Sequence, residues 1–421
     1  MKKLYEKYKD FLIVFFYDAI SKVCAAATSV FIIRMLSMND YSDYTVFSSI
    51  AGVLASIIGS GISTAYLRMS AKRIANDRAR DGSIYTFAIV IILLFTMLCF
   101  LFSNAFAYCY KVNIKIIIFG IFEAFVLSLN QLSTYVYQVR SNYSTSGKLN
   151  NIRNLSLAIL LGVFFCITHT MSVNSVMITT IISGMLSATV LISLFTKKTN
   201  FQWEMPIIDR KEFMEIFFEI KWLVVYFLFL SLINSTDVIM LRMFTTEDCV
   251  ANYGVAHKYY SLVLSLLPSI SAVLRVRSSS KEYEESPQKR LMFVLKWIKK
   301  STVLIIPVLF VLAIGAKILW HLLNGYNYDS SFYCFVIFLI GAGMSYIFAP
   351  CVNFVLSAGN HRKLCILAVI ALIINVILNY VFIKKYGVIA VTITTVFSQA
   401  IINVGSAIII VKKDRNGSHG E

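Results

Sequence analysis

The 421-residue sequence is poor in charged residues and lacks the motifs of known catalytic sites. Charged residues make up 14% of it and hydrophobic residues 58%, whereas soluble domains are about a quarter charged. No polar segment is long enough to bury a core of its own, which excludes a separate soluble catalytic domain. The P-loop, GxSxG and HExxH patterns are missing, and so is a DxD-type acidic pair that would hold a metal and a nucleotide sugar. We therefore do not expect an enzyme, and ATP is excluded as the direct energy source of this chain.

The eight cysteines indicate neither a metal centre nor a disulfide framework. They are scattered, mostly inside apolar runs, and no CxxC or Cys/His spacing is present. Most are expected to act as small buried hydrophobic residues. Cys109 and Cys249 both fall near the predicted outer face, so a pairing between them stays open.

Apolar residues gather into runs of about 20, which recur from Phe11 to Val411. Each run is long enough for a helix to cross a hydrocarbon core of about 30 Å. The start MKKLYEKYK resembles a signal-peptide n-region, but Asp18 and Lys22 follow it without a convincing cleavage site, so we expect a retained first helix. The sequence thus predicts an all-α integral membrane protein. Its roughly twelve predicted spans are residues 11–33, 44–67, 84–107, 115–138, 152–168, 174–195, 220–241, 251–274, 301–321, 331–357, 364–383 and 388–411.

The basic residues follow these spans in alternation. With a cytoplasmic N-terminus, and with residues near the span ends counted with the adjoining segment, 30 of the 39 Lys and Arg residues belong to inner segments and seven to outer ones. This is the bias that the positive-inside rule describes. We therefore predict that both termini are cytoplasmic. The net charge of +17 reflects membrane topology, and we expect no nucleic-acid partner.

A repeat divides the predicted spans into two sets of six. The first span is followed by IIRMLSMNDYSDY and the seventh by MLRMFTTEDCVANY. Arg34 corresponds to Arg242, and Asp40 to Asp248, at the same offset of 208 residues. Since each half has an even number of spans, both halves have one orientation and form a parallel repeat.

The repeat suggests the domain boundaries. We predict an N-terminal six-helix bundle over residues 1–198 and a C-terminal six-helix bundle over residues 220–421 with a short cytoplasmic tail. Residues 199–219 are expected to form a cytoplasmic amphipathic linker along the membrane interface. The charged segment 275–300 is interpreted as a surface loop or a short surface helix.

Charged side chains within the spans are candidate functional groups, because a charge at bilayer depth costs several kcal/mol unless it is paired or faces water. Asp18 and Lys22 lie one helical turn apart in the first span. They form either a self-neutralising pair or a charge site on a cavity. Asp237 in the seventh span and Lys258 in the eighth leave the same two interpretations open.

Further polar residues, one of them acidic, add to this set. Glu123, Asn130 and Gln131 fall on one face of the fourth span, where they either join helices or line a cavity. Asn234 lies in the seventh span, and His257 in the eighth is more often a packing residue than a proton carrier. The cluster Gly59-Ser60-Gly61 in the second span marks a point of flexure.

Three stretches together resemble a known family. IIRMLSMNDYSDYTVF, GSGISTAYLRMSAK and LSLINSTDVIMLRMF are similar to motifs of the polysaccharide flippases of O-antigen and capsule repeat units, within the multidrug/oligosaccharidyl-lipid/polysaccharide exporter superfamily. Ser42 stands where that family often has Gly. The resemblance extends over the whole chain.

The resemblance implies a V-shaped, MATE-like pair of bundles in a bacterial plasma membrane. Its substrate would be an undecaprenyl-pyrophosphate-linked oligosaccharide, with membrane lipids around it and a glycan polymerase and a chain-length regulator as partners. No cofactor or metal is expected beyond coupling to H⁺ or Na⁺. The candidate pyrophosphate-binding residues are Lys22, Lys258, Arg34 and Arg242. The candidate coupling groups are Asp18, Asp237, Glu123 and His257, and the polar cavity residues are Asn130, Gln131 and Asn234.

Other functions compete with this interpretation. A multidrug-type exporter and a flippase of the peptidoglycan precursor are alternatives within transport, although the latter typically carries extra C-terminal helices. A membrane glycan polymerase or ligase usually has a large outer loop, whereas the longest outer segments here have about 10 residues. A structural scaffold has no feature in its favour.

Overall fold

The structure is a computed structural model that describes residues 20–75, 82–139, 143–198, 210–267, 270–271, 274, 286–325, 328–357 and 361–417. These residues form helices and turns, and no strand occurs among them. The chain divides into two compact units, unit 1 (Met1–Ser231) and unit 2 (Leu232–Glu421).

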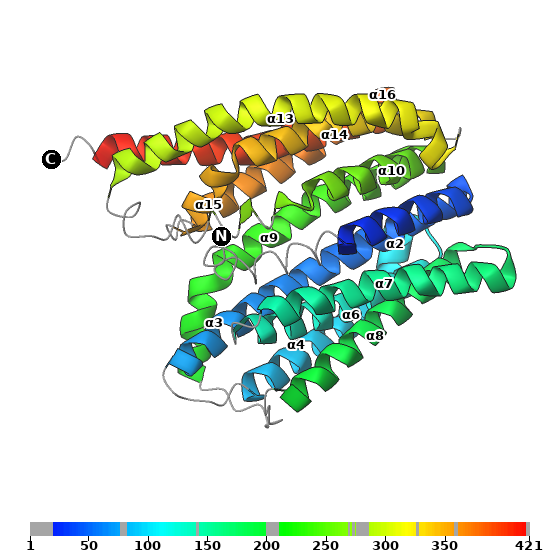
Figure 1. The fold of residues 1–421 in the computed structure, drawn as a ribbon, viewed down its shortest axis with the longest axis horizontal. Helices are drawn as coiled ribbons and strands as arrows, with labels where there is room; N and C mark the ends of the chain where they lie inside the picture. The colour runs from blue at the N-terminus through cyan, green and yellow to red at the C-terminus, as the bar shows by residue number, and fades with distance from the viewer. Residues whose placement is uncertain are drawn as a thin grey trace, which may run out of the picture. The chain divides into compact units, whose positions relative to one another are not determined.

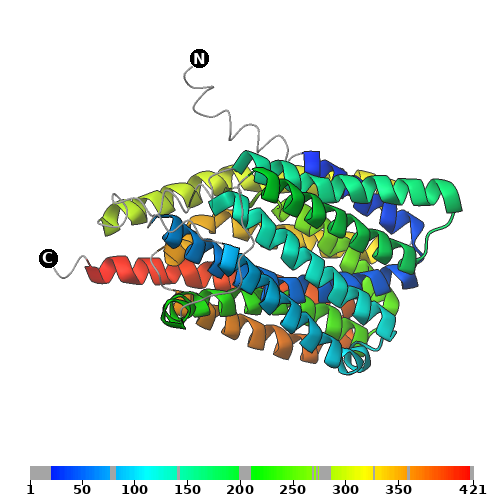
Figure 2. The same cartoon turned by 90° about the horizontal axis from the view of Figure 1, so that it is seen from below.

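Unit 1 is a bundle whose helices lie alongside one another in two perpendicular views (Figures 1 and 2). A first helix covers residues 20–35. It is followed by α2 (Met38–Ala55), the π-helical turn η1 (Ser56–Ser60), α3 (Gly61–Ala75), α4 (Gly82–Leu101), α5 (Ser103–Tyr110), α6 (Ile114–Val139), α7 (Tyr143–Thr168) and α8 (Val173–Lys198).

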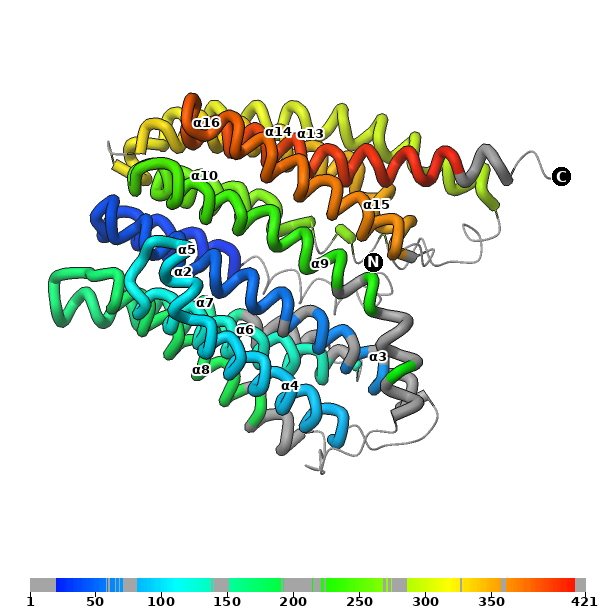
Figure 3. Tube along the Cα trace, turned by 180° about the vertical axis from the view of Figure 1, so that it is seen from behind, coloured from blue at the N-terminus to red at the C-terminus, as the bar shows by residue number. Residues whose placement is uncertain are grey.

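Unit 2 begins within α9 (Arg210–Phe244), a helix that both units share. After α9 come α10 (Glu247–Leu264), α13 (Pro287–Asn324), α14 (Asp329–Ile347), α15 (Ala349–Ser357) and α16 (His361–Gly417). The helix α14 ends before Phe348, and α15 then continues in a similar direction (Figure 3). Gly387, with φ of 54°, divides α16 into two arms.

The helices have the length and composition of membrane spans. Eight described helices are long and apolar enough to cross a membrane. In α13 the most apolar window has no buried residue at all, so its side chains suit contact with hydrocarbon rather than with water. The predicted all-α membrane fold is confirmed. Each predicted span overlaps a described helix, and the count of twelve crossings stays a prediction.

Several helices are longer than their predicted spans, and α13 and α9 exceed them by the most residues. The helix α13 begins at Pro287 rather than near residue 301, so residues 287–300 are helical and not a loop. Ser286 caps this helix by accepting a bond from the Lys289 amide, and proline suits the first helical position. The helix α9 begins at Arg210, so the C-terminal part of the predicted linker continues directly into the span, while residues 199–209 lie outside the described residues.

The two copies of the predicted repeat motif, one after the first span and one after the seventh, have the same local structure. The first helix ends at Met35 and α2 begins at Met38, while α9 ends at Phe244 and α10 begins at Glu247. In each place two residues separate consecutive helices. Ser37 caps the N-terminus of α2 by accepting a hydrogen bond from the Asp40 amide at 3.2 Å, as a serine at the N-cap position does.

Small residues bring the helices of unit 1 close to α6. The predicted flexure point coincides with η1, and a Cβ on Gly59 would lie 2.8 Å from Oε1 of Gln131 on α6. A Cβ on Gly184 of α8 would lie 2.5 Å from Cγ1 of Val126, also on α6. Association of helices in lipid depends on such close packing, because the hydrocarbon supplies no hydrophobic driving force.

We expect Gly184→Ala to destabilise the protein by roughly 1–3 kcal/mol, because Val126 and α8 must move to admit the methyl group. The thermal unfolding midpoint of the purified protein in detergent measures this. Gly162→Ala in α7 is the matched control: its Cβ would meet nothing within 4 Å, so no loss is expected. Equal midpoints for both variants would contradict the packing role of Gly184.

Candidate functional site

A buried carboxylate lies at the centre of unit 2. Asp237 is on α9 and its side chain is 0% exposed. Tyr253 of α10 donates a hydrogen bond to its Oδ2 at 2.8 Å. Asn379 and Asn375, on the first arm of α16, donate to Oδ1 at 2.8 and 3.1 Å. The hydroxyl of Thr395, on the second arm, donates to Oδ2. The carboxylate is therefore held by four uncharged groups from two other helices.

The break in α16 assembles this cluster. Asn375 and Asn379 are one helical turn apart, so they share a face of the first arm. Gly387 reverses the chain with a positive φ, which brings Thr395 of the second arm to the same carboxylate. The cluster therefore needs a chain reversal between residues that are 16 positions apart.

No described cation neutralises Asp237. The sequence left open an ion pair between Asp237 and Lys258, but among the described residues the structure contains no such pair and gives Asp237 only the uncharged partners named above. A single buried carboxylate without a cation is costly in hydrocarbon, so the site favours uptake of a positive charge. Carboxylate, amide and hydroxyl oxygens are suitable ligands for a small hard cation, and a proton would serve equally.

His257 packs next to this cluster. Its ring stacks on Tyr253 with a centroid distance of 5.7 Å and an interplanar angle of 11°, and the edge of Phe338 lies 5.8 Å away. The histidine thus contacts the ring whose hydroxyl bonds to Asp237. The packing interpretation made from the sequence fits these contacts, and a role in proton transfer stays a prediction.

Unit 1 contains a different kind of acidic site. Glu123 of α6 is 2% exposed, and its Oε1 lies 2.5 Å from Nη2 of Arg153 on α7. This carboxylate has its own cation within the unit. Its Oε2 and the Nε of Arg153 are buried and have no hydrogen-bond partner among the described residues. The pair is therefore charge-neutral but only partly satisfied.

The other polar candidates of α6 and α9 are placed as follows. The amide of Asn130 donates to the carbonyls of Val126 and Gly184 at 3.0 Å each, so it joins α6 to α8. Gln131 faces η1, beside Gly59. The Oδ1 atoms of Asn130 and Asn234 are buried, and the described residues offer them no hydrogen-bond partner. The predicted interhelical role is thus observed for Asn130, and cavity lining stays a prediction for all three.

The candidate cations differ in their surroundings. Lys22 and Lys258 are half-buried, and Arg34 is exposed. Next to Lys22, Ser21 accepts a hydrogen bond from Asn154 of α7 at 2.7 Å, which fixes the first helix within unit 1. Asp18 lies outside the described residues.

Arg242 is neutralised locally. Its Nη2 lies 2.9 Å from Oε1 of Glu247, across the two-residue link between α9 and α10. Metal-binding groups of three His, Cys, Asp or Glu side chains are missing from the described part of the chain. The cysteines there are all free, including Cys109 and Cys249.

Sequence reasoning found Asp237 but missed its partners. Asn375, Asn379 and Thr395 are uncharged polar residues of the last two predicted spans, where such residues suit hydrogen bonds to sugars as well as contacts between helices. Their shared signal was the spacing of four residues between the asparagines and the glycine that follows them at position 387. Nothing in that spacing indicated which helix they would face.

Comparison with known proteins identifies the family of this chain. A family model described as "Polysaccharide biosynthesis protein" matches residues 8–275. No sequence among the curated proteins compared with the chain matches it.

Several solved structures share the fold. A structure described as "Lipid II flippase MurJ, inward closed conformation" has a TM-score of 0.76 at 16% identity, over 96% of this chain and 89% of that one. An inward-facing multidrug resistance MATE family transporter of the MOP superfamily has a TM-score of 0.78 at 12% identity, over 96% and 98% of the two chains. The Vibrio cholerae MATE transporter VcmN in its bent form has a TM-score of 0.66 at 13% identity, over 97% and 96%. The predicted fold is confirmed.

The Glu123–Arg153 pair yields a test by double substitution. Glu123→Met or Arg153→Met alone should cost up to about 3 kcal/mol, because each leaves one buried charge without its partner, and partial exposure of Arg153 limits the loss. The double variant Glu123→Met/Arg153→Met should recover most of it, since both charges are gone. The unfolding midpoint in detergent measures this. A double variant as unstable as the sum of the two single variants would contradict the pairing.

Proposed function

Because the chain belongs to the polysaccharide biosynthesis protein family, we propose that it is a flippase. Its substrate is an undecaprenyl-pyrophosphate-linked oligosaccharide repeat unit of an O-antigen or a capsule. The protein moves this unit from the cytoplasmic to the outer leaflet of a bacterial plasma membrane by alternating access. The chain is a multi-pass membrane protein with a transporter fold, which suits this activity.

The main physical obstacle to this transport is the polar head group of the substrate. A pyrophosphate and many sugar hydroxyls cannot enter hydrocarbon without replacement of their hydration, since each unsatisfied polar group costs several kcal/mol. Charge-assisted hydrogen bonds from cations offset this cost for the pyrophosphate. Lys22 and Lys258 are our candidates for these bonds. Arg34 and Arg242 assist near the predicted outer ends, although Glu247 already neutralises Arg242 in this structure.

The observation that carries the proposal is the lone carboxylate Asp237. It is fully buried in a membrane-embedded unit, and its four hydrogen-bond partners are all uncharged. A purely structural role would be served by neutral side chains, as elsewhere in the bundle, or by a local cation, as at Glu123. We infer that Asp237 binds and releases H⁺ or Na⁺ during transport.

The ion supplies the free energy of the cycle. One elementary charge crossing the membrane potential provides about 2.3 kcal/mol per 100 mV. Since Asp237 is a single carboxylate whose four hydrogen-bond partners are neutral, a monovalent cation neutralises it completely, whereas a divalent cation leaves excess charge. A glycan polymerase and a chain-length regulator are the partners that would use the delivered repeat unit.

Two other cargoes are consistent with the fold. The matching structures include a MurJ lipid II flippase and multidrug MATE transporters, and their identities of 12–16% show the fold alone. The family description favours a saccharide cargo over a drug. Restoration of surface glycan in a flippase-deficient host, without a gain in drug resistance, would distinguish these cargoes.

We expect Asp237→Asn to abolish ion-coupled transport while the protein still folds. The substitution removes the charge but keeps the shape, and the hydroxyls of Tyr253 and Thr395 can rotate to accept from the new amide. Transport in proteoliposomes is measured with and without H⁺ and Na⁺ gradients. Asp248→Asn, which removes a charge from an exposed position, is the control and should behave as the wild type. Full gradient-driven transport by Asp237→Asn would overturn the coupling role.

The double variant Lys22→Ala/Lys258→Ala should abolish surface glycan while membrane abundance stays unchanged, because the pyrophosphate loses its proposed cationic partners. Immunostaining of the glycan, normalised to the amount of protein in the membrane, measures this. Lys317→Ala, at an exposed position of α13, is the control. Full glycan production by the double variant would exclude the cation site.

A further inference from the structure

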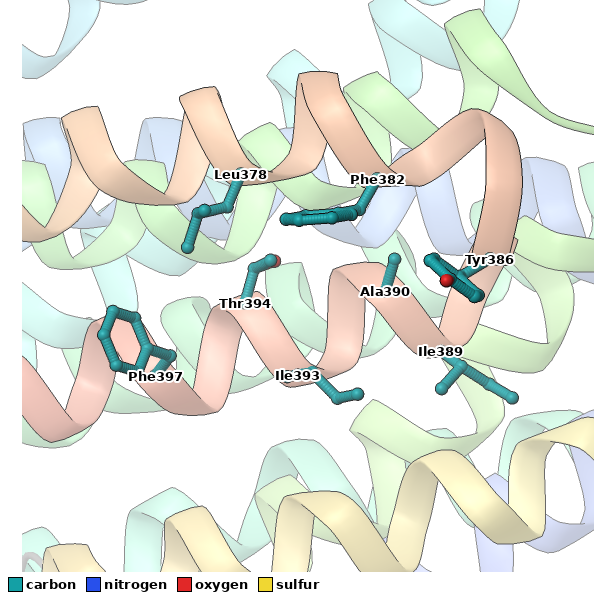
Figure 4. A pocket seen from close by; sticks show the side chains of 8 residues that line it. All are labelled: Leu378, Phe382, Tyr386, Ile389, Ala390, Ile393, Thr394 and Phe397. Carbon is teal, nitrogen blue, oxygen red and sulfur yellow. The ribbon is translucent and has the colours of Figure 1, made fainter.

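An apolar groove runs between the two arms of α16 in unit 2. It has a volume of about 400 Å³ and no role in the proposed transport of the head group. In Figure 4 the two arms lie against each other, and side chains from both border the space between them. The lining residues are Leu378, Phe382, Tyr386, Ile389, Ala390, Ile393, Thr394 and Phe397.

The groove is open to the outside of the protein and is lined mainly by apolar side chains. Ile393 and Phe397 on its rim are 52% and 51% exposed, so a molecule outside the protein can enter. Its one aliphatic hydroxyl, on Thr394, is already engaged by Asn379 and by the Val391 carbonyl. Apart from the Tyr386 hydroxyl at the lysine end, the lining therefore offers contact to hydrocarbon.

Two lysines stand at one end of the groove. Lys384 and Lys385 are exposed and immediately precede Tyr386, which lines the groove. The Nζ of Lys385 lies 5.2 Å from the centre of the Tyr386 ring, and that of Lys384 lies 6.0 Å from the ring of Phe244. Neither lysine is in an ion pair with another described residue. This end of the groove thus offers positive charge to an anion.

The groove is nearly as long as one leaflet is thick. From Ile389 to Phe397 the second arm advances about 12 Å at 1.5 Å per residue. The hydrocarbon core is about 30 Å thick, so the groove extends from the lysine end over most of the roughly 15 Å of one leaflet. In the topology predicted from the basic residues, the lysines are on the outer side.

We propose that this groove binds one acyl chain of an anionic phospholipid of the outer leaflet, whose phosphate contacts Lys384 and Lys385. The dimensions and the apolar lining suit a single chain that ends near the bilayer centre. A polyprenyl chain of the proposed substrate is branched and much longer than the groove, so it is the less suitable occupant.

The site lies directly beside the Asp237 cluster. Thr394 lines the groove and also donates to Oδ1 of Asn379, which in turn donates to Asp237. A bound chain also contacts both arms of α16, and the two arms hold Asp237 from opposite sides of the Gly387 break. Lipid binding therefore stabilises the arrangement of the arms on which the carboxylate depends.

Titration of phosphatidylglycerol and phosphatidylcholine into the detergent-solubilised full chain, with native mass spectrometry as readout, tests the proposal. Phosphatidylglycerol should bind more tightly. Lys384→Ala/Lys385→Ala should weaken its binding roughly 30-fold, or about fivefold per cation, and leave phosphatidylcholine unaffected. The control Lys111→Ala/Lys115→Ala removes two exposed cations from unit 1 and should bind as the wild type does.

A second pair of variants tests the groove itself. Ile393→Trp adds bulk from the exposed rim and should weaken binding of both lipids, whereas Ile408→Trp, at a similarly exposed position of the same arm, should not. Unfolding midpoints confirm that each variant is folded. Unchanged phosphatidylglycerol binding in Lys384→Ala/Lys385→Ala or in Ile393→Trp would overturn the site. Tighter binding of a polyprenyl phosphate than of phosphatidylglycerol would overturn the assigned occupant. Neither result bears on transport by Asp237 variants, so this proposal and the proposed function fail separately.

Discussion

Most of this structure depends on one constraint: a polar group in hydrocarbon must find its partner within the protein, because no water is there to replace it. Ser and Thr hydroxyls meet this requirement locally by donating to carbonyls in the preceding turn of their own helix, as Thr45 and Ser128 do. Asn130 meets it between helices, by bonding to the Gly184 carbonyl of α8. A carboxylate cannot be satisfied so simply, since its charge remains after its hydrogen bonds are made. The two deeply buried acids described above are therefore the exceptional points of the molecule.

The two units satisfy their acids in different ways. Glu123 has Arg153 at 2.5 Å, so the charge is neutralised permanently by a neighbouring helix. Within the described part of the chain, Asp237 has hydroxyl and amide donors and no cation, so its charge is solvated but not neutralised there. Position 29, which is 208 residues before Asp237, holds Ser29, whose hydroxyl bonds to the carbonyl of Ala25. The repeat thus preserves the helical framework and not the charge, which indicates that the halves have separate tasks.

The framework was largely predictable from sequence, because hydrophobic runs and basic loops are governed by the bilayer rather than by tertiary contacts. The ends of the helices were less predictable from the sequence. The start of α13 at Pro287 has a local signal in Ser286-Pro287, which the high charge of the following residues obscured. The Asp237 cluster was predictable only as its separate members. Periodicity places Asn375 and Asn379 on one face, but which helix that face meets depends on the packing of unit 2 and on the positive φ of Gly387.

The same chain reversal connects the cluster to the bilayer. Because α16 turns back at Gly387, one face of its two arms holds Asp237 while the other borders the lipid-facing groove, and Thr394 belongs to both. An uncompensated charge is stable only if its donors stay in place, since loss of one donor leaves a larger desolvation cost than loss of a neutral hydrogen bond. Any movement that separates the arms therefore changes how favourably Asp237 holds a cation. In a transporter, such a link allows ion binding and helix movement to drive each other, because a ligand shifts a conformational equilibrium only through its different affinity for the two states.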